Sequence, residues 1–268
     1  MICIITGLNG HGKTSLMAHF GREAIFDRER NRAMQREVAL LNANGFRLTA
    51  PQHAVASSIA CNFKKLGKTP RVPRIINPLR LGFQDGAPFK MHFTLPFETY
   101  LIDEAQMYFS SKNSKGLPAY QSAWFEEHRH SDLNIYMATP APILIHKDIR
   151  RLASCINVES KDVRYDRYGD CRITWRCKFI EAGNIDKYLD AKPREIKKYY
   201  KNIKIVADYD IHTQYNSKGC KYKFLSGHLD EDFDLNYIIS TPRTKEEYRT
   251  YIETFQKEYE EINNDETT

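Results

Sequence analysis

The sequence has no long uncharged apolar segment. None approaches the roughly 18 to 20 residues that a helix needs to cross a bilayer. We therefore expect no transmembrane segment in this chain. A signal peptide is not expected either, because a glycine-rich motif that begins at Gly7 leaves no room for its charged and apolar regions.

Closely spaced cysteine pairs are also missing. The six cysteines are scattered through 268 residues without a C-x-x-C pair. We therefore expect reduced thiols rather than disulfides or a zinc site. Internal repeats and low-complexity tracts are absent as well. The formal net charge of +6 is mild, so nucleic acid and an anionic membrane surface are both allowed as partners, and neither is strongly indicated.

The informative feature near the start of the chain is the segment GLNGHGKTS. It fits the spacing G-x-x-x-x-G-K-[ST], between a predicted buried strand at residues 2–6 and a predicted helix after it. Glycines let backbone N–H groups point at a phosphate, and the helix N-terminus adds a positive dipole. A glycine-rich turn that matches by accident is the alternative. The candidate nucleotide-binding residues are Gly7, Asn9, Gly10, His11, Gly12, Lys13, Thr14 and Ser15.

Two residues of this loop have specific predicted roles. Lys13 would bridge β- and γ-phosphate oxygens, and Thr14 would give its hydroxyl to Mg²⁺. Two acids later in the chain complement them in the segment YLIDEAQ, where an apolar strand ends in Asp103 and Glu104. The carboxyl end of a strand is where open α/β sheets bind ligands. Asp103 would hold Mg²⁺, and Glu104 would act as general base, although an exposed helix cap is the alternative.

The intervening chain gives weaker signals. We expect one long helix over residues 14–44, a strand over residues 54–63 and another near residues 75–76. No acid occurs between residues 62 and 84. A solvated loop is the ordinary interpretation of such a basic run, and a phosphate or lipid-headgroup contact is the alternative. Its basic residues are Lys64, Lys65, Lys68, Arg71, Arg74 and Arg80.

A further strand is expected at residues 133–138, with Thr139 at its end beside the nucleotide, where a polar residue can sense the γ-phosphate. Before it we expect a helix that carries His128, Arg129 and His130. Histidines at positions i and i+2 point to different faces of a helix, so we do not expect them to bind zinc.

Arg129 is a candidate arginine finger for its own nucleotide or for that of a neighbouring subunit. Arg150 and Arg151 compete for this role. An internal ion pair from Arg129 to Glu126 or Asp132 is an equally good interpretation.

Together these motifs resemble the zonular occludens toxin (Zot) family, which includes assembly ATPases of filamentous phages and is close to the FtsK–HerA DNA translocases. The resemblance is carried by GLNGHGKTS, YLIDEAQ and HRHSDLNIYMATPAPILIHKDIR. Residues 207–219 also look like a family stretch with the pattern Y-x-S/T-x-x-x-G. In all, it spans roughly residues 1–220.

The resemblance implies an α/β P-loop NTPase fold: a mostly parallel sheet flanked by helices, with a small C-terminal β/α appendage. We expect an ATPase core at residues 1–160, a β-rich extension at 161–225 and an acidic tail with a helix at 226–268. The implied function is a Mg²⁺-dependent ATPase that powers virion assembly and extrusion, or DNA translocation during it. Lys13, Glu104, Arg129 and Thr139 would carry catalysis, Thr14 and Asp103 would bind the metal, and the cofactors would be ATP and Mg²⁺.

The implied partners are further copies of the chain in a ring, phage coat or assembly-channel proteins, and single-stranded DNA. The expected location is the host bacterial cytoplasm, or the periphery of the inner membrane. Filamentous-phage members continue into a transmembrane helix, which we do not expect here, so a partner or a basic surface would supply any membrane contact. We expect residues 245–262 to form a core-packed or dimerising helix with one apolar side: Tyr248, Tyr251, Ile252, Phe255 and Tyr259.

Other functions remain open at this point. A soluble viral DNA-packaging ATPase would share the same site, and the missing span favours it. A toxin or interaction protein with a vestigial nucleotide site is less well supported, because Lys13, Thr14, Asp103 and Glu104 are all intact. A small-molecule kinase lacks support, since no arginine-rich lid insertion is evident.

Overall fold

The computed structural model describes residues 1–45, 51–82, 92, 94–112, 116–168 and 170–216. The expected acidic tail at 226–268, and the last residues of the family-like stretch 207–219, lie outside these described residues. Among the described residues, no helix combines the length and the apolar character that a bilayer span requires.

An eight-stranded sheet forms the centre of the fold, in the order β4-β2-β5-β6-β1-β7-β8-β9. The strands from β4 to β7 run parallel, and β8 and β9 are antiparallel additions at one side. The expected fold class, a mostly parallel sheet flanked by helices, is confirmed. The strands are β1 (Ile2–Gly7), β2 (Val55–Ser57), β4 (Arg74–Ile75), β5 (Thr99–Ile102), β6 (Asn134–Ala138), β7 (Ser154–Tyr165), β8 (Cys171–Ile180) and β9 (Lys201–Ala207).

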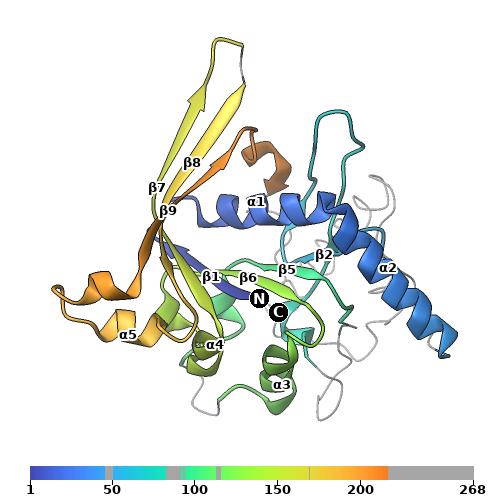
Figure 1. The fold of residues 1–268 in the computed structure, drawn as a ribbon, viewed down its shortest axis with the longest axis horizontal. Coiled ribbons are helices and arrows are strands. Elements are labelled where there is room, and N and C mark those ends of the chain that lie inside the picture. The colour runs from blue at the N-terminus through green and yellow to red at the C-terminus, as the bar shows by residue number, and fades with distance from the viewer. Residues whose placement is uncertain (46–50, 83–91, 93, 113–115, 169, 217–268) are drawn as a thin grey trace, which may run out of the picture.

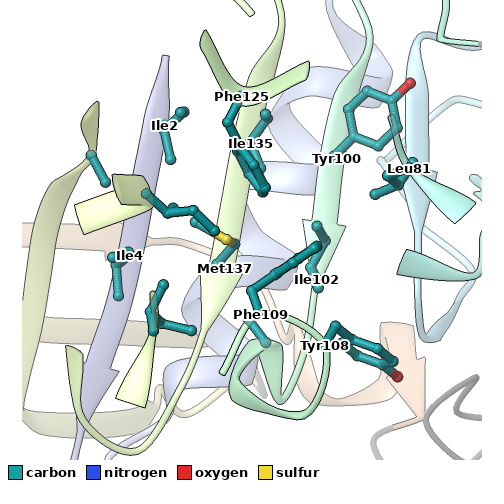
Figure 2. Packing of buried hydrophobic residues seen from close by; sticks show 14 of the residues in the cluster. Ile2, Ile4, Leu81, Tyr100, Ile102, Tyr108, Phe109, Phe125, Ile135 and Met137 are labelled. Carbon is teal, nitrogen blue, oxygen red and sulfur yellow. The ribbon is translucent and has the colours of Figure 1, made fainter. Parts of the chain in front are cut away.

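Helices cover both faces of this sheet. The helix α1 (Lys13–Phe26) lies over one face and continues into α2 (Arg28–Ala43), whereas α3 (Ala119–Glu127), α4 (Lys147–Leu152) and α5 (Ile185–Asp190) cover the other (Figure 1). The strands are therefore apolar on both sides, as buried parallel strands require. Ile2 and Ile4 pack in the cluster of the second face (Figure 2), while Cys3 and Ile5 pack beneath α1.

The single long helix expected over residues 14–44 is wrong, because the chain breaks at Asp27. This residue has an extended backbone, and its carboxylate accepts hydrogen bonds from the backbone N–H groups of Glu29 and Arg30. Such a short acidic side chain caps a new helix rather than continuing the old one. The break lets α2 turn away from the sheet while α1 stays over it (Figure 1).

The strand expected over residues 54–63 is also shorter than predicted. It divides into β2 in the main sheet and β3 (Ala60–Cys61), which pairs antiparallel with β10 (Tyr215–Asn216) in a separate two-stranded sheet. Ser57 explains the division, because its hydroxyl donates to the carbonyl of Ile59 and accepts from the N–H of the same residue. This local turn redirects the chain and brings β10 close to α1.

The antiparallel part of the sheet begins within β7. This strand of 12 residues runs across residue 160, where the sequence suggested a domain boundary, and its far half pairs only with β8. The resulting hairpin projects beyond the helices (Figure 1). The division into three regions stays a prediction, and β8 and β9 extend the same sheet as the core.

Candidate nucleotide-binding site

The glycine loop connects β1 to α1 as the sequence predicts. Gly10 and Gly12 have left-handed backbones, with φ of 85° and 88°, and Gly12 is the residue that precedes α1. A Cβ atom on Gly12 would lie 2.7 Å from Cδ of Lys161 and 2.8 Å from Oγ of Ser15. Both the backbone angle and the lack of space therefore require glycine here.

The side chain of Lys13 curls back over this loop. Its ammonium donates to the carbonyl oxygens of Gly7, at 2.9 Å, and Leu8, at 3.2 Å. Ser15 donates to the carbonyl of Gly12 at 2.8 Å and so supports the first turn of α1. The positive charge of Lys13 is thus held at the end of β1, where backbone amides and the N-terminus of α1 also favour an anion.

Thr14 and Asp103 come together from distant parts of the chain. The hydroxyl of Thr14 donates to Oδ1 of Asp103 at 3.1 Å, and the carboxylate is buried at the end of β5. Two neighbouring oxygen ligands of an octahedral Mg²⁺ lie about 3 Å apart, given metal–oxygen distances of about 2.1 Å. The separation and the chemistry of these two oxygens therefore fit one magnesium ion.

Glu104 follows Asp103 with an unusual backbone. Its φ of 52° and ψ of 42° are left-handed, a conformation that costs a non-glycine residue roughly 1–3 kcal/mol. The carboxylate is half-buried, lines the same cavity as Asp103 and accepts a hydrogen bond from the amide of Gln106 at 2.6 Å. The strained backbone turns the side chain next to the phosphate loop.

Thr139 lies where the sequence predicts, at the end of β6. It is buried, and its N–H donates to the carbonyl of Ile5 in the neighbouring β1. Its hydroxyl donates to the carbonyl of Ala141 at 3.3 Å. Thr139 therefore borders the same cavity from the strand between those of Asp103 and the phosphate loop.

These elements enclose a cavity of about 330 Å³ at the carboxyl edge of the sheet. Two of the predicted binding residues, Gly7 and His11, do not line it, and Nδ1 of His11 lies 3.1 Å from the carbonyl of Val158. The lining residues are Asn9, Gly10, Gly12, Lys13, Thr14, Ser15, Asp103, Glu104, Ala138, Thr139, Lys161, His212 and Tyr215.

Three of these lining residues, Lys161, His212 and Tyr215, were missed by the sequence analysis. Nζ of Lys161 lies 3.3 Å from Nε2 of His212, whose Nδ1 lies 3.4 Å from the hydroxyl of Tyr215. Partial burial lowers the pKa of Lys161, and desolvation together with the Lys161 charge lowers that of His212. Desolvation raises the pKa of Tyr215 to about 12. Near neutral pH, this wall thus has one positive charge beside two neutral rings.

Arg129 does not lie where the sequence placed it. The helix α3 ends at Glu127, and residues 128–132 form the turn that leads into β6. This turn is at the amino end of β6, whereas Thr139 and the cavity are at its carboxyl end, about 17 Å away for a five-residue strand. Arg129 is exposed there, and among the described residues it forms no ion pair, so the expected pairs with Glu126 and Asp132 are absent.

Arg150 and Arg151 also lie away from the cavity, on α4 before the amino end of β7. Nε of Arg150 pairs with Asp186 at 2.6 Å, and its guanidinium also donates to the carbonyl of Ile145 at 2.6 Å. Arg151 is exposed and lies 3.6 Å from Asp148. Neither arginine lines the cavity of its own subunit.

Two solved structures are similar to this chain. The N-terminal domain of zonular occludens toxin from Neisseria meningitidis has a TM-score of 0.42 and 16% identity, covering 80% of this chain and 98% of that one. The genome packaging NTPase B204 from Sulfolobus turreted icosahedral virus 2, solved in complex with ATP-gammaS, has a TM-score of 0.30 and 12% identity. It covers 62% of this chain and 76% of its own. No curated protein sequence matches the chain.

The family comparison is more specific. The model of the family described as zonular occludens toxin (Zot) matches residues 1–167. This range includes the phosphate loop, Asp103, Glu104, Thr139 and Lys161 and excludes His212 and Tyr215. With more than half of its 268 residues matched, this chain belongs to the Zot family.

Proposed function

We propose that this chain is a Mg²⁺-dependent ATPase that powers phage virion assembly and extrusion, or DNA translocation during that process. The observation that carries the proposal is the 3.1 Å contact between the Thr14 hydroxyl and Asp103, beside the loop that holds Lys13. These residues are 89 positions apart in sequence. Their meeting at the mouth of a glycine loop is what a metal–triphosphate site requires.

The phosphates of ATP would be bound by the loop and by Lys13. The N–H groups at the start of α1 face the same space, and the ammonium of Lys13 would exchange its carbonyl partners for β- and γ-phosphate oxygens. Mg²⁺, held by Thr14 and Asp103, would neutralise charge that develops on the phosphates.

Glu104 is suited to accept a proton from the attacking water. Its carboxylate lines the cavity one residue beyond Asp103 and accepts a hydrogen bond from the neutral amide of Gln106. A carboxylate in this position can serve as a general base. Thr139, on the neighbouring strand, would contact the γ-phosphate or the water through its hydroxyl.

Lys161 provides a second positive charge within the same subunit. Its side chain lies against Gly12 and lines the same cavity as Asp103. A charge at this position would stabilise negative charge that develops on the γ-phosphate, the role that Arg129 was expected to fill. We propose Lys161 for this role in cis and leave Arg129 as a candidate in trans only.

The proposed partners follow from membership of the family. They are further copies of this chain in a ring, phage coat or assembly-channel proteins and single-stranded DNA, in the cytoplasm of a bacterial host. The family membership over residues 1–167 supports a phage-related role.

The first experiment is an ATPase assay of the full chain with Mg²⁺ and with EDTA. We expect Mg²⁺-dependent release of phosphate, and a loss of about 10²–10³-fold or more in turnover in Lys13→Ala, the size expected when one charged donor to a transition state is removed. Lys187→Ala, on the exposed side of α5, is the matched control. Wild-type turnover in Lys13→Ala would contradict the site.

A further inference from the structure

Basic side chains converge on one buried aromatic ring at the C-terminal end of α1, far from the phosphate loop. The ring of Phe26 is only 6% exposed. The charged groups come from α1 and from the hairpin of residues 63–71, and they lie within 6 Å of the ring centre: Arg71 at 4.8 Å, Lys68 at 5.7 Å, Arg22 at 5.8 Å and Lys65 at 5.9 Å. Each such contact is favourable, because a ring face is negative. We call this group, with Arg28 and Lys64, the Phe26 cluster.

Most of the charge in this cluster has no acidic partner. Arg22 pairs with Glu23, but in the described part of the chain no ion pair includes Arg28, Lys64, Lys65, Lys68 or Arg71. The nearby carboxylate of Asp27 is occupied by backbone N–H groups of α2. Desolvation lowers the pKa of Lys68, and neighbouring positive charges lower it further. The Phe26 cluster is therefore a concentration of positive charge, most of it without an acidic side chain to pair with among the described residues.

A hydrogen bond to the C-terminal end of α1 accounts for only one cation of the Phe26 cluster. Nη1 of Arg71 donates to the carbonyl of Ile25 at 2.6 Å, which satisfies the negative end of the helix. Lys64 and Arg28 are exposed, and among the described residues their side chains make no such contact with the helix end. Packing and helix stabilisation therefore leave these two charges without a structural reason.

The hairpin that carries the lysines ends in an exposed apolar residue. Its strands are joined by the bridge between Phe63 and Arg71, and Gly67 at its tip has a left-handed φ of 69°. Leu66, beside this glycine, is fully exposed at 101% of its reference area. An apolar side chain at the tip of a turn is surrounded by water, which is unfavourable unless it inserts into a partner or a membrane.

We infer that the hairpin of residues 63–71 and the Phe26 cluster form a docking surface for an anionic lipid membrane. The lysines would lie among the headgroups, and Leu66 would enter the acyl boundary. Nucleic acid fits less well, because the ring of Phe26 is buried under the cations and cannot stack on bases. The exposed side chain of Leu66 would also bury no apolar surface against a phosphate backbone.

A second exposed tip points to the same side of the molecule. The β7–β8 hairpin and the segment between β3 and β4 both project beyond α1 in the same direction (Figure 1). The β7–β8 tip has Tyr165 at 61% and Tyr168 at 75% exposure. Tyrosine is favoured at the headgroup level of bilayers. Two projecting tips would hold the ATPase core at a fixed orientation on the membrane.

The test is co-sedimentation of the full chain with vesicles, without nucleotide. We expect binding to vesicles of 70% phosphatidylcholine and 30% phosphatidylserine, and little binding to phosphatidylcholine alone. Each lysine near such a surface contributes about five-fold in partitioning. Lys65→Ala/Lys68→Ala should therefore bind about 10- to 30-fold more weakly. Lys197→Ala/Lys198→Ala, which removes two exposed lysines elsewhere, is the charge-matched control and should bind like the wild type.

Leu66→Ser separates insertion from simple charge attraction. Its side chain is fully exposed, so the fold should not depend on it, and we expect a drop of about five-fold or more in vesicle binding with unchanged net charge. Equal loss in both double variants would reduce the effect to net charge and overturn the proposal. The proposal also fails if the Lys65→Ala/Lys68→Ala variant loses binding to a single-stranded oligonucleotide while its vesicle binding is unchanged. Neither outcome depends on ATPase activity, so the proposed function stands or fails separately.

Discussion

Charged side chains are held differently at the two ends of the parallel strands, which we call the amino edge and the carboxyl edge of the sheet. At the amino edge, the carboxylate of Glu98 is fully buried, pairs with Arg74 at 2.6 Å and accepts a hydrogen bond from the hydroxyl of Tyr100 at 2.6 Å. At the carboxyl edge, Lys13 contacts carbonyl oxygens and Lys161 contacts the ring of His212. Among the described residues, neither lysine forms an ion pair.

The charges at the amino edge stabilise the fold, whereas those at the carboxyl edge are available to bind an anionic ligand. A buried carboxylate with a cation and several donors is satisfied by the protein itself. Cations held by neutral groups at a glycine loop are satisfied better by a triphosphate. We therefore expect substitutions at the carboxyl edge to change turnover with little effect on stability, and substitutions at the amino edge to do the reverse.

The largest effect is expected for Glu104 at the carboxyl edge. In Glu104→Gln the amide cannot accept a proton, so turnover should fall by about 10²–10⁴-fold, while ATP binding persists because the side chain keeps its size. Asp103→Ala should instead weaken Mg²⁺-dependent binding of an ATP analogue. Steady-state turnover and binding titrations with and without Mg²⁺ measure both. Equal loss of binding in the two variants would refute this division of roles.

Glu98→Gln tests the amino edge. It leaves the buried guanidinium of Arg74 without its counter-charge, and breaking a buried pair in this way costs about 3–5 kcal/mol. Urea unfolding should show this loss, while turnover per folded molecule stays unchanged. The matched control is Glu181→Gln, whose pair with Lys201 is exposed and contributes little to stability. Similar losses in the two variants would remove the distinction between the edges.

Much of the carboxyl edge could be predicted because its signals are local. The phosphate loop needs glycines within eight residues, and Asp103 follows directly from an apolar strand. Thr139 follows in the same way from β6. These positions depend on which strand ends where, which a parallel sheet fixes once its strands are recognised.

The rest of the site depends on contacts that no local pattern encodes. Lys161 reaches the cavity only because β7 continues past the sheet and its side chain lies over Gly12. Tyr215 arrives through a pairing with Cys61 that spans more than 150 residues. The error on Arg129 arose because α3 ends one turn early: Nδ1 of His128 lies 2.5 Å from the carbonyl of Phe125, and Asp132 turns the chain with a φ of 50°.

A smaller effect at the amino edge should appear as the pH falls. Burial, with a contribution from the charge of Arg71, lowers the pKa of His53 to about 4 from 6.5 in the unfolded chain. Between these values the unfolded chain binds a proton that the folded chain does not, so stability is present above pH 6.5 and is lost as the pH falls towards 4. The loss should reach about 2–3 kcal/mol.

His53→Gln removes this proton and should flatten the dependence over that range. Urea unfolding at several pH values from 7 to 4 measures it. His130→Gln, which replaces a histidine that is 80% exposed, is the control. An identical slope in wild type and His53→Gln would show that His53 titrates normally in the fold. Turnover near neutral pH should be the same for both, since His53 lies just before β2, away from the cavity.

The smallest expected change in turnover tests which cation acts on the γ-phosphate: Lys161 at the carboxyl edge or Arg129 at the amino edge. Lys161→Ala should lower turnover about ten-fold, because a half-exposed charged donor to the γ-phosphate is lost. Arg129→Ala should change turnover of dilute subunits by less than about two-fold, since Arg129 lies at the opposite end of β6. Turnover at low and high protein concentration measures both. A large loss in dilute Arg129→Ala would contradict its position at the amino edge.

Arg129 can act only in trans, where the amino edge of one subunit packs against the carboxyl edge of the next. In that arrangement its removal would cost on the order of 10³–10⁵-fold, and only in the assembled state. Mixing Arg129→Ala subunits with Glu104→Gln subunits would then restore activity, because each defect belongs to a different face of a shared site. If mixing restores nothing and assembled Arg129→Ala keeps its turnover, Lys161 is the cation that serves the γ-phosphate.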